Sequence, residues 1–216
     1  MIRIYKKNND PLFWKEYIRK KGLRTYQDLD NEEDGPDIRS RLRNELISEQ
    51  KGLCCYCLSS IKNKPSHNEH FLPQSKYPRK SLDYKNIFCS CNSKETCGNI
   101  KKDSSVQIVN PSENNPESHF RYLANGKIEG TDQIGKDTID VLNLNHRSLM
   151  KSRETLLKRC KEMCAYTSKE EVKKTYIDPN PNTGFLPSYC SMVEYFMREG
   201  LFDDSDKLKQ FATKLD

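Results

Sequence analysis

The sequence lacks long apolar runs. It contains no hydrophobic stretch of membrane length, and its first residues, MIRIYKKNND, hold no apolar run of the kind that forms a signal peptide. We therefore expect a protein of the reducing cytoplasm with no membrane partner. The sequence also has no internal repeat and no low-complexity tract, which argues against repeat architectures.

Apolar residues are modest in number for a chain of this length. They make up 34% of the 216 residues, which suffices for small cores but not for one deep core. We expect a small module that is held together by something besides apolar packing, combined with helices.

Cysteine is plentiful, with nine residues. In a reducing compartment, closely spaced cysteine pairs bind metal more often than they form disulfides. Cys54 and Cys57 form a Cys-x-x-Cys pair, whose spacing lets both sulfurs of a tight turn face one zinc ion. A redox role for this pair lacks the βαβ context that it normally has. Cys160, Cys164 and Cys190 fall at apolar positions and are interpreted as core residues.

A second group of cysteines, Cys89, Cys91 and Cys97, can complete the zinc site. Tetrahedral zinc takes four ligands, so only one of Cys89 and Cys91 fits together with Cys97 and the first pair. Cys55 is surplus. The spacing alone leaves Cys89 and Cys91 as alternatives.

Positive charge gathers around these cysteines. The chain carries a net charge of +6, and residues 60–103 hold nine basic groups against four acidic ones. Such a field suits a polyanionic substrate, because phosphate contacts supply most of the sequence-independent affinity of nucleic-acid binders. A solvated basic surface is the alternative explanation for a charge excess of this size.

The segment between the two cysteine groups contains Glu69 and His70. Hydrolysis of a phosphodiester needs a general base, a divalent cation and a basic wall. Glu69 is predicted to bind magnesium or manganese, and His70 to act as the base, since imidazole titrates near working pH. Neighbouring residues of a strand point to opposite faces, so the two have different roles. His67 is a second candidate base, interpreted as an exposed loop residue.

Asn86 follows His70 by sixteen residues. Its side-chain amide is predicted to pin the loop that carries His70, a role in orientation and not in proton transfer. An ordinary turn residue is the alternative for Asn86 taken alone.

The pattern of apolar, proline and glycine residues divides the chain into three regions. We expect a helical segment over residues 1–48, a zinc-containing module over 49–103, and a hairpin with a mostly helical region over 104–216. Helices are expected from Asp10-Pro11 to Gly22, from Gly35-Pro36 to Gly52, over 98–102, from a cap at Asn145 onward, and around 192–197. Short strands are expected between Ile61 and Ile87, and a hairpin turn at Asn125-Gly126.

The central motifs resemble those of a known enzyme family. The strings CCYC, EHFLPQSKYP, DYKNIFCSCN and CGNIK are similar to the ββα-metal motif of HNH nucleases, and within that group to the HNH endonucleases of Septu-type and retron-associated anti-phage systems. The flanking strings MIRIYKK, LRNELISEQKGL, NGKIEG and IDVLNLNHRSLMKSRETLL are also similar, so the resemblance covers most of the chain. It implies an α+β fold with a zinc-stapled ββα-metal HNH module between N-terminal and C-terminal helical segments.

The resemblance also implies roles for individual residues. A structural zinc would be held by Cys54, Cys57, Cys91 and Cys97. His70 would be the general base, Glu69 a ligand of the catalytic magnesium or manganese, and Asn86 the middle asparagine. HNH motifs generally place a histidine or asparagine directly after the last cysteine, where this chain has glycine, so Asn99 is the candidate metal ligand one step later. Lys101 keeps the basic position and is expected to contact a phosphate.

These residues together predict a metal-dependent HNH endonuclease that cleaves DNA as the effector of an anti-phage system. The resemblance implies an SMC-like or ABC-like ATPase as a partner and, in retron versions, a reverse transcriptase with its RNA-DNA hybrid. Two alternatives remain from the residues themselves. One is RNA cleavage by the same site, and the other is a zinc-containing nucleic-acid-binding adaptor without catalysis.

Overall fold

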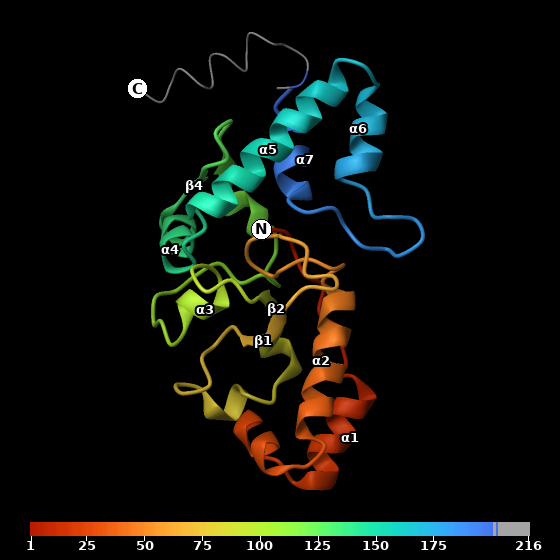
Figure 1. Ribbon diagram of the computed structural model, residues 1–216. Coiled ribbons are helices and arrows are strands. Elements are labelled where there is room, and N and C mark those ends of the chain that lie inside the picture. The colour runs from red at the N-terminus through yellow and green to blue at the C-terminus, as the bar shows by residue number, and fades with distance from the viewer. Residues whose placement is uncertain (201, 203–216) are drawn as a thin grey trace.

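The fold is mixed, with helices and two small sheets among the residues that the structure describes. The computed structural model describes residues 1–200 and residue 202. Figure 1 shows α1 and α2 at one end, β1, β2 and α3 in the middle, and α5, α6 and α7 at the other end. This arrangement confirms the expected class, a mixture of helices and strands. The last part of the expected region 104–216 lies outside the described residues.

The N-terminal segment consists of helices α1 (Leu12–Lys21) and α2 (Gly35–Glu49). Helix α1 ends as expected at Gly22, whose φ of 66° is readily adopted only without a side chain. The prediction of Asp10 as its cap is wrong, because Pro11 occupies the N-cap position and no side chain caps the helix.

Helix α2 leads the chain into the first cysteine pair through Gln50. The Gln50 Nε2 atom donates to the carbonyls of Leu53 and Cys89, at 2.8 Å each, and Oε1 accepts from the Cys89 N–H at 2.6 Å. Gln50 is buried, and a buried amide is stable only when its hydrogen bonds are made. One side chain thereby joins the end of α2 to the strand on which Cys89 lies.

The middle of the protein is an antiparallel pair of strands, β1 (Ser66–His70) and β2 (Ile87–Cys91), followed by the short helix α3 (Gly98–Lys101). The strands were expected between residues 61 and 87, and the second one begins only where that range ends. The reason is the proline-punctuated stretch after β1, which forms a loop with short 3-10 turns. The 3-10 helices of the described chain are Tyr26–Asn31, Pro78–Lys80, Tyr84–Asn86 and Pro116–His119.

The C-terminal region begins with the expected hairpin. Its elements are β3 (Phe120–Tyr122), β4 (Ile128–Gly130), α4 (Gln133–Val141), α5 (Arg147–Cys164), α6 (Lys169–Tyr176) and α7 (Cys190–Arg198). Gly126 in the turn has φ 79°, and a Cβ there would lie 2.1 Å from the Met150 carbonyl oxygen. A glycine is therefore required at this turn both by the backbone and by the close approach of α5.

Helix α5 begins at Arg147, with His146 as its N-cap. The prediction of Asn145 as the cap is wrong, because the Asn145 side chain binds the N–H and the carbonyl of Ile128, at 2.8 Å each. This amide completes the backbone hydrogen bonding of β4 instead. The hairpin, which is distant along the chain, thus competes with the helix terminus for the side chain.

The later cysteines belong to the core, as expected. Cys160 and Cys190 are buried and Cys164 is half-buried, and all three pack against other apolar side chains. Within the described part of the chain, no helix combines the length and the apolar character that crossing a membrane would need.

Candidate functional site

Four cysteine sulfurs form a cluster beside β2. The Sγ atoms all lie within 4.8 Å of one another and belong to Cys54, Cys57, Cys91 and Cys97. The Sγ atoms of Cys57 and Cys91 are 3.9 Å apart, and sulfurs bound to tetrahedral zinc at about 2.3 Å would be roughly 3.8 Å apart. The cluster is therefore compatible with one zinc ion held by four sulfurs.

The structure distinguishes between Cys89 and Cys91, which the sequence spacing left as alternative ligands. Cys91 is the last residue of β2 and joins the cluster, whereas Cys89 is buried in the strand pair opposite Asn68. Burial raises the pKa of the Cys89 thiol to about 12. Burial likewise raises the pKa of Cys55 well above its usual range. Neither the Cys89 sulfur nor the Cys55 sulfur belongs to the cluster of four.

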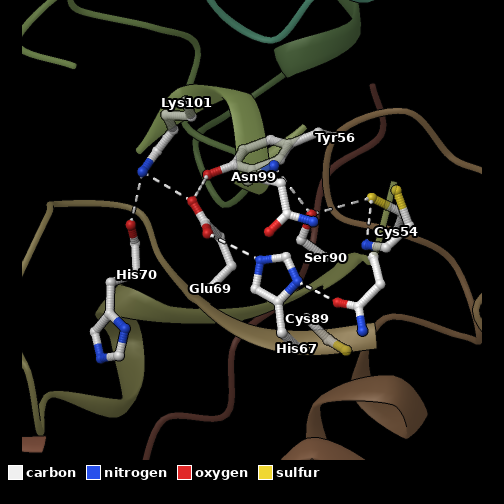
Figure 2. A network of polar contacts seen from close by, with 12 residues as sticks. Cys54, Tyr56, His67, Glu69, His70, Cys89, Ser90, Asn99 and Lys101 are labelled. Atoms are coloured by element: carbon white, nitrogen blue, oxygen red, sulfur yellow. Dashed lines mark hydrogen bonds and ion pairs between the residues drawn. The ribbon is translucent and has the colours of Figure 1, made fainter. Parts of the chain in front are cut away.

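Hydrogen bonds surround the Cys54 sulfur (Figure 2). The Cys91 N–H donates to it at 3.4 Å, and the Ser90 hydroxyl lies 3.7 Å away. Burial acts to raise the pKa of Cys54, but hydrogen bonds from the other cysteines outweigh burial and hold it well below the usual range. These contacts stabilise the charged form that a metal requires.

Glu69 lies at the centre of a polar network. In Figure 2, Ser90 lies between this carboxylate and the Cys54 sulfur. Its Oε1 atom accepts from the Tyr56 hydroxyl at 3.0 Å and from the Lys101 Nζ at 2.8 Å. Burial acts to raise the pKa of Glu69, but the contacts of His67 and Lys101 outweigh it and lower the pKa below its ordinary value. The carboxylate is therefore charged, although its side chain is only 8% exposed.

His67 faces the other oxygen of this carboxylate. The His67 Nε2 atom is 3.4 Å from Glu69 Oε2, and the Nδ1 atom is 2.7 Å from Asn92 Oδ1. His67 was expected in an exposed loop, but it lies on β1 and is partly buried. The spacing of two residues could have revealed this, because residues i and i+2 of a strand share a face.

His70 lies on the other face of β1. Its Nε2 atom donates to the Ser81 carbonyl at 2.8 Å, and its Nδ1 atom is 3.1 Å from the amide nitrogen of Gln74. The ring also packs edge-on against Tyr26, with centroids 4.7 Å apart. Burial lowers the pKa of His70, which favours the neutral imidazole.

Asn86 binds the loop that follows His70 with three hydrogen bonds. Its Oδ1 atom accepts from the Leu72 N–H at 2.8 Å, and its Nδ2 atom donates to the carbonyls of Leu72 and Lys80 at 3.1 and 3.0 Å. The loop between β1 and β2 is thereby held from both ends. This is the geometry of a residue that orients a loop.

The two predicted site residues on α3 have different surroundings. Asn99 donates from Nδ2 to the Ser93 carbonyl at 2.9 Å. Lys101 is buried, and its Nζ binds Glu69 and donates to the His70 carbonyl at 2.9 Å. The lysine that was expected to contact a phosphate is therefore engaged inside the site.

Gly98 completes the site at a position that the sequence did not single out as functional. A Cβ on Gly98 would lie 2.4 Å from Glu69 Oε2 and 2.7 Å from His67 Nε2. Both distances are too short for real contacts. The helix α3 therefore approaches Glu69 and His67 so closely that a Cβ on Gly98 would require both side chains to shift.

Comparisons with known proteins agree with these features. The chain is 34% identical over 102 residues to a Bacillus thuringiensis protein named "Septu protein PtuB", a match that spans 46% of this chain and 38% of that relative. It is 29% identical over 167 residues to a Vibrio cholerae protein named "Retron Vc95 putative HNH endonuclease", a match that spans 70% of this chain and 80% of that relative. No protein-family model matches the chain. The two relatives confirm the resemblance and support the enzyme class, an endonuclease, that the motifs predicted.

Proposed function

We propose that this chain, a relative of the HNH endonucleases of Septu-type and retron-associated systems, hydrolyses phosphodiester bonds in DNA with a divalent cation. The observation that supports this function most strongly is the placement of the Glu69 carboxylate, charged and buried between β1 and α3 beside a cluster of four cysteines. Two strands and a helix around such a carboxylate are the order of elements that a ββα-metal module requires.

The two kinds of metal have separate tasks in this proposal. Zinc on the four cysteines would stabilise the fold, since four thiolates leave no open position for a substrate. Magnesium or manganese on Glu69 would stabilise the charge that develops on the phosphate and the leaving oxygen. The lowered pKa of Glu69 supports this role, because a charged carboxylate is the ligand that these hard cations prefer.

His70 is the proposed general base. The Ser81 carbonyl accepts the Nε2–H of His70, which leaves Nδ1 as the atom that can take a proton from water. The amide of Gln74 now binds that nitrogen, so Gln74 must turn away when the base acts. Asn86 holds the loop that carries Gln74 in place after β1.

The residues of α3 connect these roles. Lys101 binds the Glu69 carboxylate and the His70 carbonyl, so it sets the distance between the metal ligand and the strand end that carries the base. The resemblance implied a second oxygen ligand at Asn99, whose Nδ2 atom is held by the Ser93 carbonyl. DNA would meet the basic residues that surround this module.

The proposed setting is a defence complex in the cytoplasm. The names of the two relatives support a role in Septu-type or retron-associated systems. An ATPase subunit would then control the nuclease, and a reverse transcriptase with its RNA-DNA hybrid would be a further partner in a retron. RNA is the alternative substrate, because a carboxylate, a cation and an imidazole do not require or exclude a 2′-hydroxyl.

A cleavage assay tests the function directly. The full chain is incubated with plasmid DNA and with total RNA, with magnesium, manganese or no added divalent cation, beside the His70→Ala variant. We expect metal-dependent cutting of DNA that the variant loses. Absence of cutting by the chain alone, and also in the presence of an ATPase encoded beside it, would contradict the proposal.

One observation favours a second function, a zinc-containing nucleic-acid-binding adaptor. The Glu69 carboxylate is already bound by Tyr56 and Lys101, an arrangement that a purely structural ion pair would also show. An adaptor would bind nucleic acid with or without magnesium and would not cut it. Binding that is unaffected by Glu69→Gln, together with no cleavage, would favour this function.

A further inference from the structure

We propose that His67, and not Asn99, is the second ligand of the catalytic cation, and that Gly98 is glycine because the cation and the His67 imidazole occupy the place of a side chain there. The assignment rests on the proposed function for the role of the cation. It changes which residue completes the HNH motif in this chain. Three separate features of the structure support it.

The first feature is the pairing of His67 with Glu69. The two side chains share one face of β1, and His67 Nε2 lies 3.4 Å from Glu69 Oε2. Neighbouring ligands that bind an octahedral cation at about 2.1 Å lie about 3 Å apart. Glu69 Oε1 is used by Tyr56 and Lys101, so Oε2 is the oxygen that remains for the cation.

The second feature is the orientation of the His67 ring. Asn92 Oδ1 lies 2.7 Å from His67 Nδ1 and accepts the proton of that nitrogen. Whenever the ring is neutral, its lone pair is then on Nε2, the atom that faces Glu69. Metal-binding histidines are usually oriented in this way by a carbonyl or carboxylate at the other ring nitrogen.

The third feature is Gly98. Any side chain on Gly98 would begin 2.4 Å from Glu69 Oε2 and 2.7 Å from His67 Nε2. Gly98 does not have a left-handed φ, so its backbone accepts other residues, and a Cβ there would instead displace the Glu69 and His67 side chains. The His67 imidazole, which comes from β1, thus lies in the space that a side chain on Gly98 of α3 would fill.

Asn99 does not have these features. Its Nδ2 atom is bound to the Ser93 carbonyl, and among the described residues no hydrogen bond joins it to Glu69. A second histidine offers a matched control. His146 Nε2 is also 3.4 Å from a carboxylate, that of Glu95, but this pair is more exposed than the pair of His67 and Glu69.

Binding of manganese tests the assignment without reference to catalysis. Mn²⁺ binding to the zinc-loaded full chain is measured by electron paramagnetic resonance, for the wild type and for His67→Ala, Gly98→Ala, Asn99→Ala and His146→Ala. We expect the dissociation constant to rise at least tenfold in His67→Ala and Gly98→Ala, and to stay within about twofold in the other two. Zinc content and the thermal midpoint of each variant report whether the fold is intact, and His67→Gln replaces His67→Ala if that variant fails to fold.

The outcomes are distinct from those of the cleavage assay. Unchanged manganese affinity in folded His67→Ala and His67→Gln would overturn the assignment, even if both variants lost cleavage, because His67 would then be a base and not a ligand. A tenfold loss in Asn99→Ala would overturn it as well. A wild-type chain that binds manganese through His67 but never cuts nucleic acid would sustain the site and contradict the proposed function.

Discussion

Lys101 and Glu69 form an ion pair in the interior of the site, with Nζ 2.8 Å from Oε1 and side chains that are 4% and 8% exposed. The same Nζ donates to the carbonyl of His70. Taking two charges out of water is costly, and Lys101 stabilises the buried Glu69 carboxylate together with Tyr56 and His67. The residue that was expected to meet the substrate is therefore part of the framework that holds the last two residues of β1, Glu69 and His70.

Removal of one partner of this pair should be strongly destabilising. We expect Lys101→Met to lower the free energy of unfolding by about 3 kcal/mol, because the buried Glu69 carboxylate would lose its ammonium partner. Urea denaturation measures the change. The control is Lys80→Met, which breaks an exposed pair with Asp83 and should cost less than about 1 kcal/mol. A double variant, Lys101→Met with Glu69→Gln, should lose less than the sum of its two single changes, and strict additivity would show that the pair is not coupled.

Zinc binding should depend on Cys91 and not on Cys89. We expect Cys57→Ser and Cys91→Ser to lose zinc and to melt at least about 10 °C lower, because a structural zinc site contributes folding free energy. Cys89→Ser should keep one zinc per chain. Zinc content by atomic absorption and a thermal melt check both statements. A folded Cys91→Ser protein with full zinc content would show that another group is the fourth ligand.

Cleavage should fall by about 10²-fold to 10⁴-fold in His70→Ala, the usual contribution of a general base. The pKa of His70 is lowered by burial from its ordinary value of 6.5, so the neutral base persists as the pH drops to 6.5 and somewhat below. We expect the acidic limb of the wild-type rate profile to lie below pH 6.5. The residual activity of His70→Ala should show no such limb, and a limb above pH 7 in the wild type would contradict the assignment.

The pinning of the loop by Asn86 should be visible in its dynamics. Asn86→Ala removes three hydrogen bonds to the backbone of Leu72 and Lys80 and should cost about 2 kcal/mol, since the backbone groups lose their partner. Hydrogen-deuterium exchange should become faster over residues 71–80 and cleavage should decrease. Asn99→Ala, which removes one bond to Ser93, is the control and should leave exchange in this loop unchanged.

The local part of the fold could be predicted from the sequence. Gly22 ends α1 as expected, and the turn at Asn125-Gly126 joins β3 and β4. These features depend on a few adjacent residues. The caps were less predictable, because Asn145 is drawn to the backbone of Ile128 and leaves the helix start to His146. A side chain with two suitable hydrogen-bond partners binds the partner that the tertiary structure brings nearer.

By itself, the sequence determined the group of cysteines, the endonuclease motif and the presence of Glu69, His70 and Asn86 in it, because short spacings fix which residues share a turn or a strand. Only the tertiary structure decided that Cys91 and not Cys89 joins the cluster, that Lys101 binds Glu69, and that Gly98 lies beside the Glu69 carboxylate. The physical reason is that these contacts depend on how β1, β2 and α3 pack against one another, with the side chains of a strand alternating between its two faces. The identity of the neighbours across that packing is not encoded in any local pattern.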